Sequence, residues 1–289
     1  MTLQQWLLLC VPAFFWGSAF ILMEIALPTF SPLVIVTGRM CIAAIVLNTI
    51  VWRQGKGWPR NPWVWIECAA LSLINNLLPF GFVVWGQQYI DASLASILIA
   101  SAPVFTVVIA SAVGKERLTW LRSAGVALSF SGVVILIGPS VLRGIDLKGL
   151  GEIAMLGAAL CYSLSGFWTL TITMGAWSVL PSSLATGNLS AAFEFTDHSL
   201  VNWPWAAVLS VGALGVFSTA IAYIIYFKLL AEVGVVNTSL VSFLVPLSAL
   251  VMRLLVLKEQ LTWEASAGMS LILAGLSVLD GRLLKRTVG

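Results

Sequence analysis

The sequence is poor in charged residues and has a single histidine. Soluble domains carry about 25% charged residues, whereas this chain of 289 residues has 15 Lys or Arg and 12 Asp or Glu, which is 9%. Hydrophobic residues make up 60% of the chain, and its mean hydropathy is +1.00. This composition excludes a cytosolic enzyme, a disordered chain and a nucleic-acid-binding protein, and it predicts an integral membrane protein.

The scarcity of histidine also excludes the usual catalytic and metal sites of membrane enzymes. Zinc hydrolases need clustered histidines and a membrane serine protease needs a Ser–His pair inside a span, but His198 falls in a predicted outer loop. The four cysteines lie far apart in apolar stretches, so neither disulfides nor a metal-binding pair is indicated. We therefore expect no enzyme activity, no metal and no cofactor.

Long apolar runs make up most of the chain. Each run is interpreted as a membrane-spanning helix, for which about 20 apolar residues are needed. Residues 173–204 are only modestly apolar, so hydropathy leaves that segment undecided. The nine clear runs cover 6–27, 32–52, 64–87, 93–113, 122–138, 150–172, 205–228, 235–257 and 264–279.

An internal repeat resolves the undecided segment. A shift of 143 residues aligns 94–138 with 237–281 without a gap, and the motif Lys-Glu-x-Leu-Thr-Trp occurs in both copies. Two halves of five spans each require a weak seventh span within 173–204. The chain is therefore predicted to be an all-α integral membrane protein with ten transmembrane helices, divided into five-helix repeats at 1–141 and 142–289.

The distribution of basic residues supports ten spans and fixes their direction. Lys and Arg accumulate in cytoplasmic loops, and a ten-span chain with its N-terminus inside leaves only Arg143, Lys148 and Lys258 in outer loops. Both termini are thus predicted in the cytoplasm, and an odd number of spans per half inverts the second repeat. Inverted repeats are typical of secondary transporters, whose two halves expose a central site to each side in turn.

Several polar and aromatic side chains are expected near the bilayer centre. Asn76 and Phe80 lie four residues apart on one helical face, and the 143-residue offset carries them onto Thr219 and Tyr223. Amide, hydroxyl and aromatic groups suit a ligand with an apolar body and hydrogen-bonding groups, although hydrogen bonding between helices is the alternative. The predicted cavity-lining residues are Trp16, Asn76, Phe80, Tyr162, Thr219, Tyr223 and Tyr226.

Two prolines occupy equivalent positions in the two halves. Pro103 and Pro246 each remove a backbone hydrogen bond within an apolar run, which lipid cannot replace. We expect them to mark matching bends that serve gating.

Charged residues inside the runs are few. All of them lie close enough to the end of a run for their side chains to reach the lipid headgroups. Since no carboxylate is expected at the centre, an obligatory proton or sodium gradient is not predicted, and Glu24 is the one candidate for coupling. These charged residues are Glu24, Arg39, Glu67 and Arg253.

The sequence resembles the EamA-type members of the drug/metabolite transporter superfamily over almost its full length. The resemblance rests on Phe15-Trp16-Gly17-Ser18, on Arg39, on the duplicated layout and on the equal spacing from each central proline to the glutamate of the repeated motif. Trp85-Gly86-Gln87-Gln88 is similar to the amino-acid exporter branch. Residues 173–197 depart from the family, in which the seventh span is fuller.

The resemblance implies an exporter of the inner membrane that acts as a monomer on small metabolites, such as amino acids including aromatic ones. A multidrug or nucleoside-type exporter of the same fold is an alternative. A passive channel is a weaker one, because a channel would usually show a polar or charged ring. The expected partners are a small-molecule substrate and the lipid bilayer.

Overall fold

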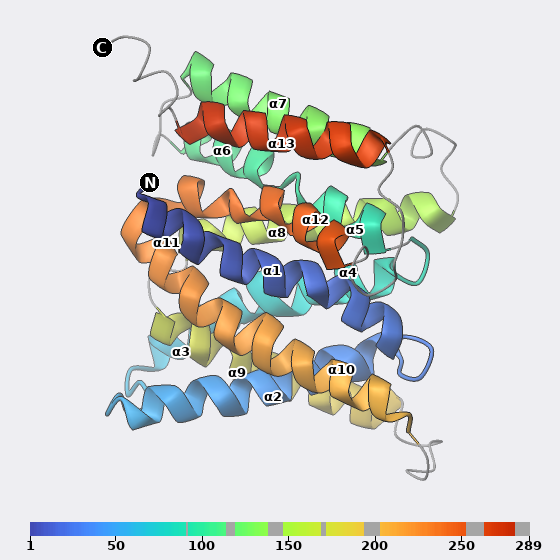
Figure 1. Cartoon of the computed structure of the whole chain (residues 1–289). Coiled ribbons are helices and arrows are strands. Elements are labelled where there is room, and N and C mark those ends of the chain that lie inside the picture. The colour runs from blue at the N-terminus through green and yellow to red at the C-terminus, as the bar shows by residue number, and fades with distance from the viewer. Residues whose placement is uncertain are drawn as a thin grey trace.

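The computed structural model describes residues 1–90, 92–113, 119–137, 147–168, 172–193, 203–252 and 263–280, and within these ranges the chain is helical with no strand (Figure 1). The helices in the first half are α1 Leu3–Ala26, α2 Pro32–Arg53, α3 Pro62–Ser72, the π-helical turn η1 Leu73–Leu77, α4 Leu78–Gly86, α5 Ala92–Ile99, α6 Ala102–Ala112 and α7 Trp120–Ile137. Those in the second half are α8 Leu147–Trp168, α9 Ile172–Phe193, α10 Trp205–Gly215, the π-helical turn η3 Val216–Ile221, α11 Ala222–Ser239, α12 Val241–Met252 and α13 Trp263–Asp280.

The first helices begin at local capping signals. Thr2 accepts a hydrogen bond from the backbone N–H of Gln5, and the Gln5 side chain accepts one in return from the N–H of Thr2, which forms a capping box. Ser31 caps α2 ahead of Pro32, and Asn61 caps α3 ahead of a proline in the same position. A proline suits the first turn because its missing N–H would have no helical partner there.

Five of the described helical stretches are long and apolar enough to cross a bilayer, which confirms a multi-pass membrane architecture. Two further apolar helices, Ala102–Ala112 and Val241–Met252, are shorter. That the chain has ten spans in total stays a prediction. The five stretches are Leu3–Ala26, Pro32–Arg53, Pro62–Gly86, Gly149–Phe167 and Trp205–Ser239.

The undecided segment contains a helix. α9 runs from Ile172 to Phe193, with Pro181 in its interior, and packs along α2. Asn48 of α2 donates a hydrogen bond to the carbonyl of Ala176, with 3.2 Å between nitrogen and oxygen. The departure of residues 173–197 from the family pattern therefore does not remove the helix, because contacts with its neighbours compensate for its modest hydropathy.

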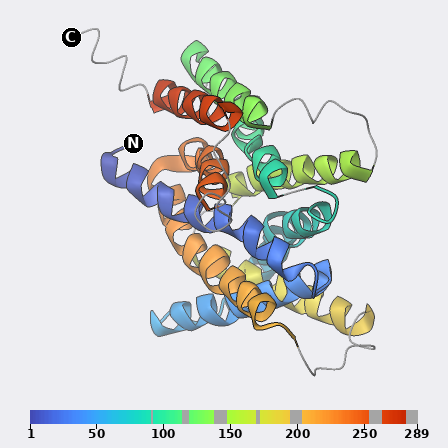
Figure 2. The same cartoon turned by 45° about the vertical axis from the view of Figure 1, so that its right-hand side comes forward.

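Some equivalent positions of the two halves have equivalent geometry. The π-helical turns begin at Leu73 and Val216, which are 143 residues apart. Helices α7 and α13 lie side by side in both views of the molecule (Figures 1 and 2), and Ser129 donates to the carbonyl of Ile272 across that same interval. A Cβ on Gly132 would lie 2.7 Å from the Gly268 carbonyl oxygen, so only glycine permits this contact.

The expected bends at the two central prolines are not found as a matching pair. The fourth run is broken between α5 and α6, and Pro103 lies in the first turn of α6, where its missing N–H costs nothing. Pro246 lies inside α12, and the break in that half comes earlier, at Leu240. A second irregularity is Gly234 within α11, whose φ of 79° favours glycine.

The first and last described helices each have one end at the same side of the bundle. The N-terminal end of α1 and the C-terminal end of α13 both lie at the left in Figure 1, and they remain together in the rotated view of Figure 2.

Candidate functional site

A cavity lies in the centre of the helix bundle, between segments from both halves. It contains about 830 Å³ of space that no atom fills, including the part open to the outside. Its lining residues come from α1, α2, η1, α4, α5, α6, α8, α11 and α12.

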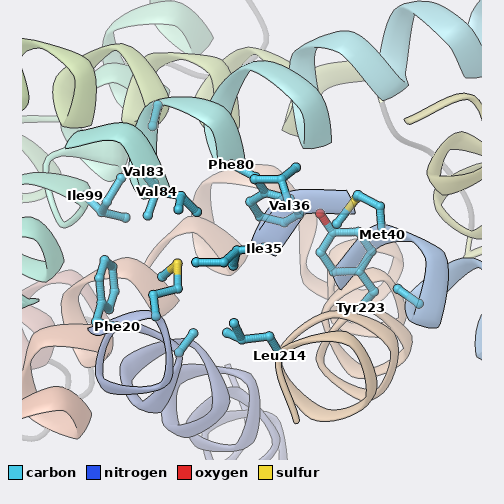
Figure 3. Close-up of a cluster of buried hydrophobic side chains, with 14 of the residues drawn as sticks. Phe20, Ile35, Val36, Met40, Phe80, Val83, Val84, Ile99, Leu214 and Tyr223 are labelled. Carbon is cyan, nitrogen blue, oxygen red and sulfur yellow. The ribbon is translucent and has the colours of Figure 1, made fainter. Parts of the chain in front are cut away.

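The cavity wall is mainly apolar and aromatic. Figure 3 shows Phe20, Val83 and Ile99 grouped at one part of the buried cluster, with Phe80 and Tyr223 further along it, and all five line the cavity. Such a wall accommodates an apolar ligand body, and isolated polar groups on it select the ligand's orientation.

The cavity lies where the two halves meet symmetrically. Twelve of the twenty described residues that line it form six pairs whose members are 143 residues apart, so each half contributes the same six positions. The pairs are Ala19 with Tyr162, Phe20 with Ser163, Phe80 with Tyr223, Val83 with Tyr226, Ile99 with Ser242, and Ala102 with Val245.

Trp16 lines this cavity from the middle of α1. Its indole Nε1 donates to the carbonyl of Ser218 at 2.9 Å, and its ring packs against Tyr226 with 5.2 Å between ring centroids. The π-helical turn η3 makes this possible, because it shifts the helical hydrogen-bonding pattern and the Ser218 carbonyl accepts side-chain donors. The predicted need of a central tryptophan for a hydrogen-bond partner is thereby met.

A hydrogen-bonded cluster joins four helical segments beside the cavity. The Tyr223 hydroxyl donates to Oδ1 of Asn76 at 2.8 Å and accepts from Nδ2 of Asn75 at 3.0 Å. Ser165 of α8 donates to Oδ1 of Asn75 at 2.8 Å, and Asn76 in turn donates to Oγ of Ser178 on α9 at 3.3 Å. Mutual hydrogen bonding offsets the cost of burying two amides in an apolar bundle.

The sequence-based assignment of the cavity wall needs two corrections. Trp16, Phe80, Tyr162, Tyr223 and Tyr226 line the cavity, whereas Asn76 and Thr219 are fully buried behind it. The neighbour Asn75 lines the cavity instead of Asn76. The reason is the π-helical turn η1, in which residues five apart share a face, so Asn75 rather than Asn76 aligns with Phe80.

Arg39 lies inside the bundle, contrary to the expectation that it would reach the headgroups. It is 3% exposed and lines the cavity. Its Nε donates to Oγ1 of Thr219 at 2.7 Å and its Nη2 to the Ser218 carbonyl at 3.2 Å. Its Cζ lies 3.8 Å from the centroid of the Phe80 ring, a cation–π contact.

The remaining sequence candidates lie away from the cavity. Glu24 and Glu67 are exposed, and Arg253 falls outside the described residues. Gln87 is buried and donates from Nε2 to the Phe20 carbonyl at 3.2 Å, while its Oε1 has no hydrogen-bond partner among the described residues.

Removing the Tyr223 hydroxyl is expected to destabilise the protein, and removing that of Tyr226 is not. Tyr223→Phe deprives both buried amides of a hydrogen bond, at a cost of about 1–3 kcal/mol. Tyr226, three residues along α11, has no hydroxyl hydrogen bond within the described chain, so Tyr226→Phe is the matched control. Thermal unfolding in detergent measures the stability of both variants. Equal unfolding midpoints for the two variants would contradict the stabilising role of the hydrogen bonds around Tyr223.

Comparison with known proteins supports a transporter. An uncharacterized transporter, YoaV, of Bacillus subtilis is 26% identical over 90% of this chain and 91% of its own length. A protein named a probable amino-acid metabolite efflux pump, from Salmonella typhimurium, is 27% identical over 94% of this chain and 93% of its own. Neither relative is named as an enzyme.

The fold and the family agree with these relatives. A crystal structure of a protein 18% identical in sequence superimposes with a TM-score of 0.78 over 98% of this chain and 99% of the other, which establishes the fold alone at that identity. The sequence profile of the EamA-like transporter family matches residues 5–138 and 149–279. The resemblance seen in the sequence is confirmed, and the chain belongs to the EamA-like transporter family.

Proposed function

We propose that the protein is a secondary transporter that exports small amphipathic metabolites, amino acids and aromatic ones among them, through the central cavity. The observation that carries this proposal is the cavity itself, which has six symmetric pairs of lining residues from the two halves. Aromatic rings suit an apolar ligand body, and Asn75 with the tyrosine hydroxyls suits its polar groups. We propose that the protein acts as a monomer.

The proposed mechanism is alternating access between two inverted five-helix repeats, 1–141 and 142–289. If the halves are nearly equivalent, each can adopt the conformation of the other, and the site then opens to the opposite side. The helix break between α5 and α6, the break at Leu240 and the kink at Gly234 are the proposed points of bending. In this proposal Pro103 and Pro246 limit the helical hydrogen bonding next to these points.

Counterflow in proteoliposomes tests the proposed function. Vesicles loaded with unlabelled amino acid are expected to accumulate the labelled compound transiently and saturably without any imposed proton or sodium gradient. A nucleoside or drug that does so instead would favour the alternative exporter classes. Flux that rises linearly with concentration and shows no counterflow would favour a passive channel. Accumulation driven by a pH step and lost in Glu24→Gln would reveal coupling through Glu24.

The proposed topology has ten spans in the inner membrane with both termini in the cytoplasm. The distribution of basic residues supports it, as does the position of the N-terminal end of α1 and the C-terminal end of α13 at one side of the bundle (Figure 1). A cysteine introduced by Lys285→Cys is expected to react with an impermeant thiol reagent only after the cells are opened. Labelling of that cysteine in intact cells would exclude this topology, and a cysteine at Lys258 should show the opposite behaviour.

A further inference from the structure

Arg39 is a buried positive charge that the described protein does not neutralise. No Asp or Glu in the described ranges forms an ion pair with it, and the titratable groups that interact with it are the phenols of Tyr162 and Tyr223. The other described side chains that line the cavity are all neutral. A charge within a membrane-spanning bundle is costly without a counter-ion, and such residues mark sites of function.

The guanidinium group also retains hydrogen-bond donors for a ligand. Of its five N–H groups, Nε uses one on Thr219 and Nη2 uses one on Ser218. Nη1 has no partner in the part of the chain that the structure describes. Nη1 is also not fully enclosed by the protein. Among the described residues, the only fully enclosed side-chain nitrogen or oxygen without a hydrogen-bond partner is Oε1 of Gln87. Nη1 therefore faces the cavity that Arg39 lines.

The position of the guanidinium is fixed before any ligand arrives. Two hydrogen bonds hold one edge against η3, and the ring of Phe80 covers one face. The edge formed by Nη1 and Nη2 remains, and two N–H groups on one such edge match the two oxygens of a carboxylate. A donor that is already oriented loses little entropy when it binds.

We propose that Arg39 binds a carboxylate of the transported molecule, so that the substrates are monocarboxylates or zwitterionic amino acids. This inference rests on the proposed function, since it assigns the substrate class of the same cavity. Tyr162 and Tyr226 line the cavity, and their hydroxyls, which have no hydrogen-bond partner among the described residues, are further candidate donors to the ligand. The aromatic faces of Trp16 and Tyr226 suit the ammonium group of an amino acid.

The charge of Arg39, the one charged side chain among the described residues that line the cavity, separates the candidate substrate classes. A monoanionic carboxylate neutralises Arg39, whereas a dianionic phosphate leaves one negative charge among neutral lining groups. A cationic drug without a carboxylate is repelled by the guanidinium. A neutral nucleoside leaves the charge of Arg39 without a counter-ion.

Pairs of compounds that differ only in the carboxylate test this inference on the unchanged protein. The pairs are L-phenylalanine with phenethylamine, L-leucine with 3-methylbutylamine, and 3-phenylpropionate with 3-phenylpropanamide. Binding is measured by thermal stabilisation in detergent, and transport by competition in counterflow. We expect the carboxylate member to bind at least about tenfold more tightly in one pair or more. Equal binding within every pair, preference for the amines, or no binding by any member would overturn the assignment.

Substitution of Arg39 tests the residue itself. Arg39→Gln is expected to reduce the preference within the same pair to less than about threefold, while Arg39→Lys retains part of it because the charge remains but the paired donors are lost. Arg53→Gln, at the exposed end of the same helix, is the control and should leave the preference unchanged. An unaltered preference for the carboxylate member in folded Arg39→Gln would refute the assignment. If that variant does not fold, the compound pairs measured on the unchanged protein decide whether the cavity binds a carboxylate.

The same experiments separate failure of this inference from failure of the proposed function. Uridine and tetraphenylphosphonium are included in the counterflow assay as a nucleoside and a lipophilic cation. If only these show saturable counterflow, the protein is a transporter and the carboxylate assignment is wrong. If no compound shows counterflow, the transport proposal fails, and the thermal-stabilisation pairs still decide whether Arg39 binds a carboxylate.

Discussion

Replacing Gly17 by alanine is expected to prevent normal packing of α1 against α12. A Cβ at this position would lie 2.6 Å from Cβ of Ser248, 2.7 Å from the backbone nitrogen of Ala249 and 2.8 Å from the carbonyl oxygen of Val245. Two of these are backbone atoms, which cannot move aside without displacing the helix. Overpacking of this kind costs about 1–3 kcal/mol or more. We expect a large loss of monodisperse protein in detergent and a lower unfolding temperature.

Gly212→Ala is the matched control for this prediction. Gly212 also lies inside a helix, α10, but a Cβ there would meet no atom within 4 Å. Alanine has a higher helix propensity than glycine by about 1 kcal/mol, so this variant should unfold at the same or a slightly higher temperature. If Gly17→Ala matched Gly212→Ala in yield and unfolding temperature, the close approach of α1 and α12 would not occur in the protein.

Truncation of Trp16 is expected to reduce transport more than it reduces folding. Trp16→Ala removes a ring from the cavity wall, the contact with Tyr226 and the hydrogen bond to the Ser218 carbonyl. An aromatic contact is worth about 0.5–1.5 kcal/mol beyond its buried area, and the Ser218 carbonyl keeps its hydrogen bond from Arg39, which limits the effect on folding. The concentration for half-maximal counterflow should rise about tenfold or more. For Trp16→Phe this concentration should lie between that of Trp16→Ala and that of the unchanged protein.

Trp205→Ala is the control for Trp16, because Trp205 is 79% exposed at the start of α10 and lines no part of the cavity. It should transport at the parent rate. Parent-like flux in Trp16→Ala, or loss of flux only through aggregation, would assign Trp16 to packing rather than to the substrate site.

Much of the site was predictable from the sequence because of its repeat. Trp16, Phe80 and Tyr223, which the sequence places near the bilayer centre, line the central cavity of the structure, and their role in binding a substrate stays a proposal. The choice between Asn75 and Asn76 was not predictable. Counting in steps of 3.6 residues assumes a regular α-helix, and one π-helical turn rotates the following side chains enough to exchange the two asparagines.

The location of Arg39 depends on tertiary packing that hydropathy does not encode. It lies seven residues from the start of α2, or about 10 Å along the helix, a distance over which an arginine can still extend to the headgroups. Thr219 and the carbonyl of Ser218 hold it inside instead. Both acceptors belong to η3, nearly 180 residues away, and the 143-residue offset pairs Arg39 with a serine, so the repeat gave no signal either.

The two π-helical turns also bear on the ancestry of the chain. Each turn holds one residue more than an α-helical turn of the same rise, and both begin at the same position of their half. Two independent insertions at one equivalent place are a less economical history than a single insertion in an ancestral half-length gene before it was copied and fused. By that history the irregularity is older than the full-length protein, and an alignment of either half with a single-repeat relative should need no gap there.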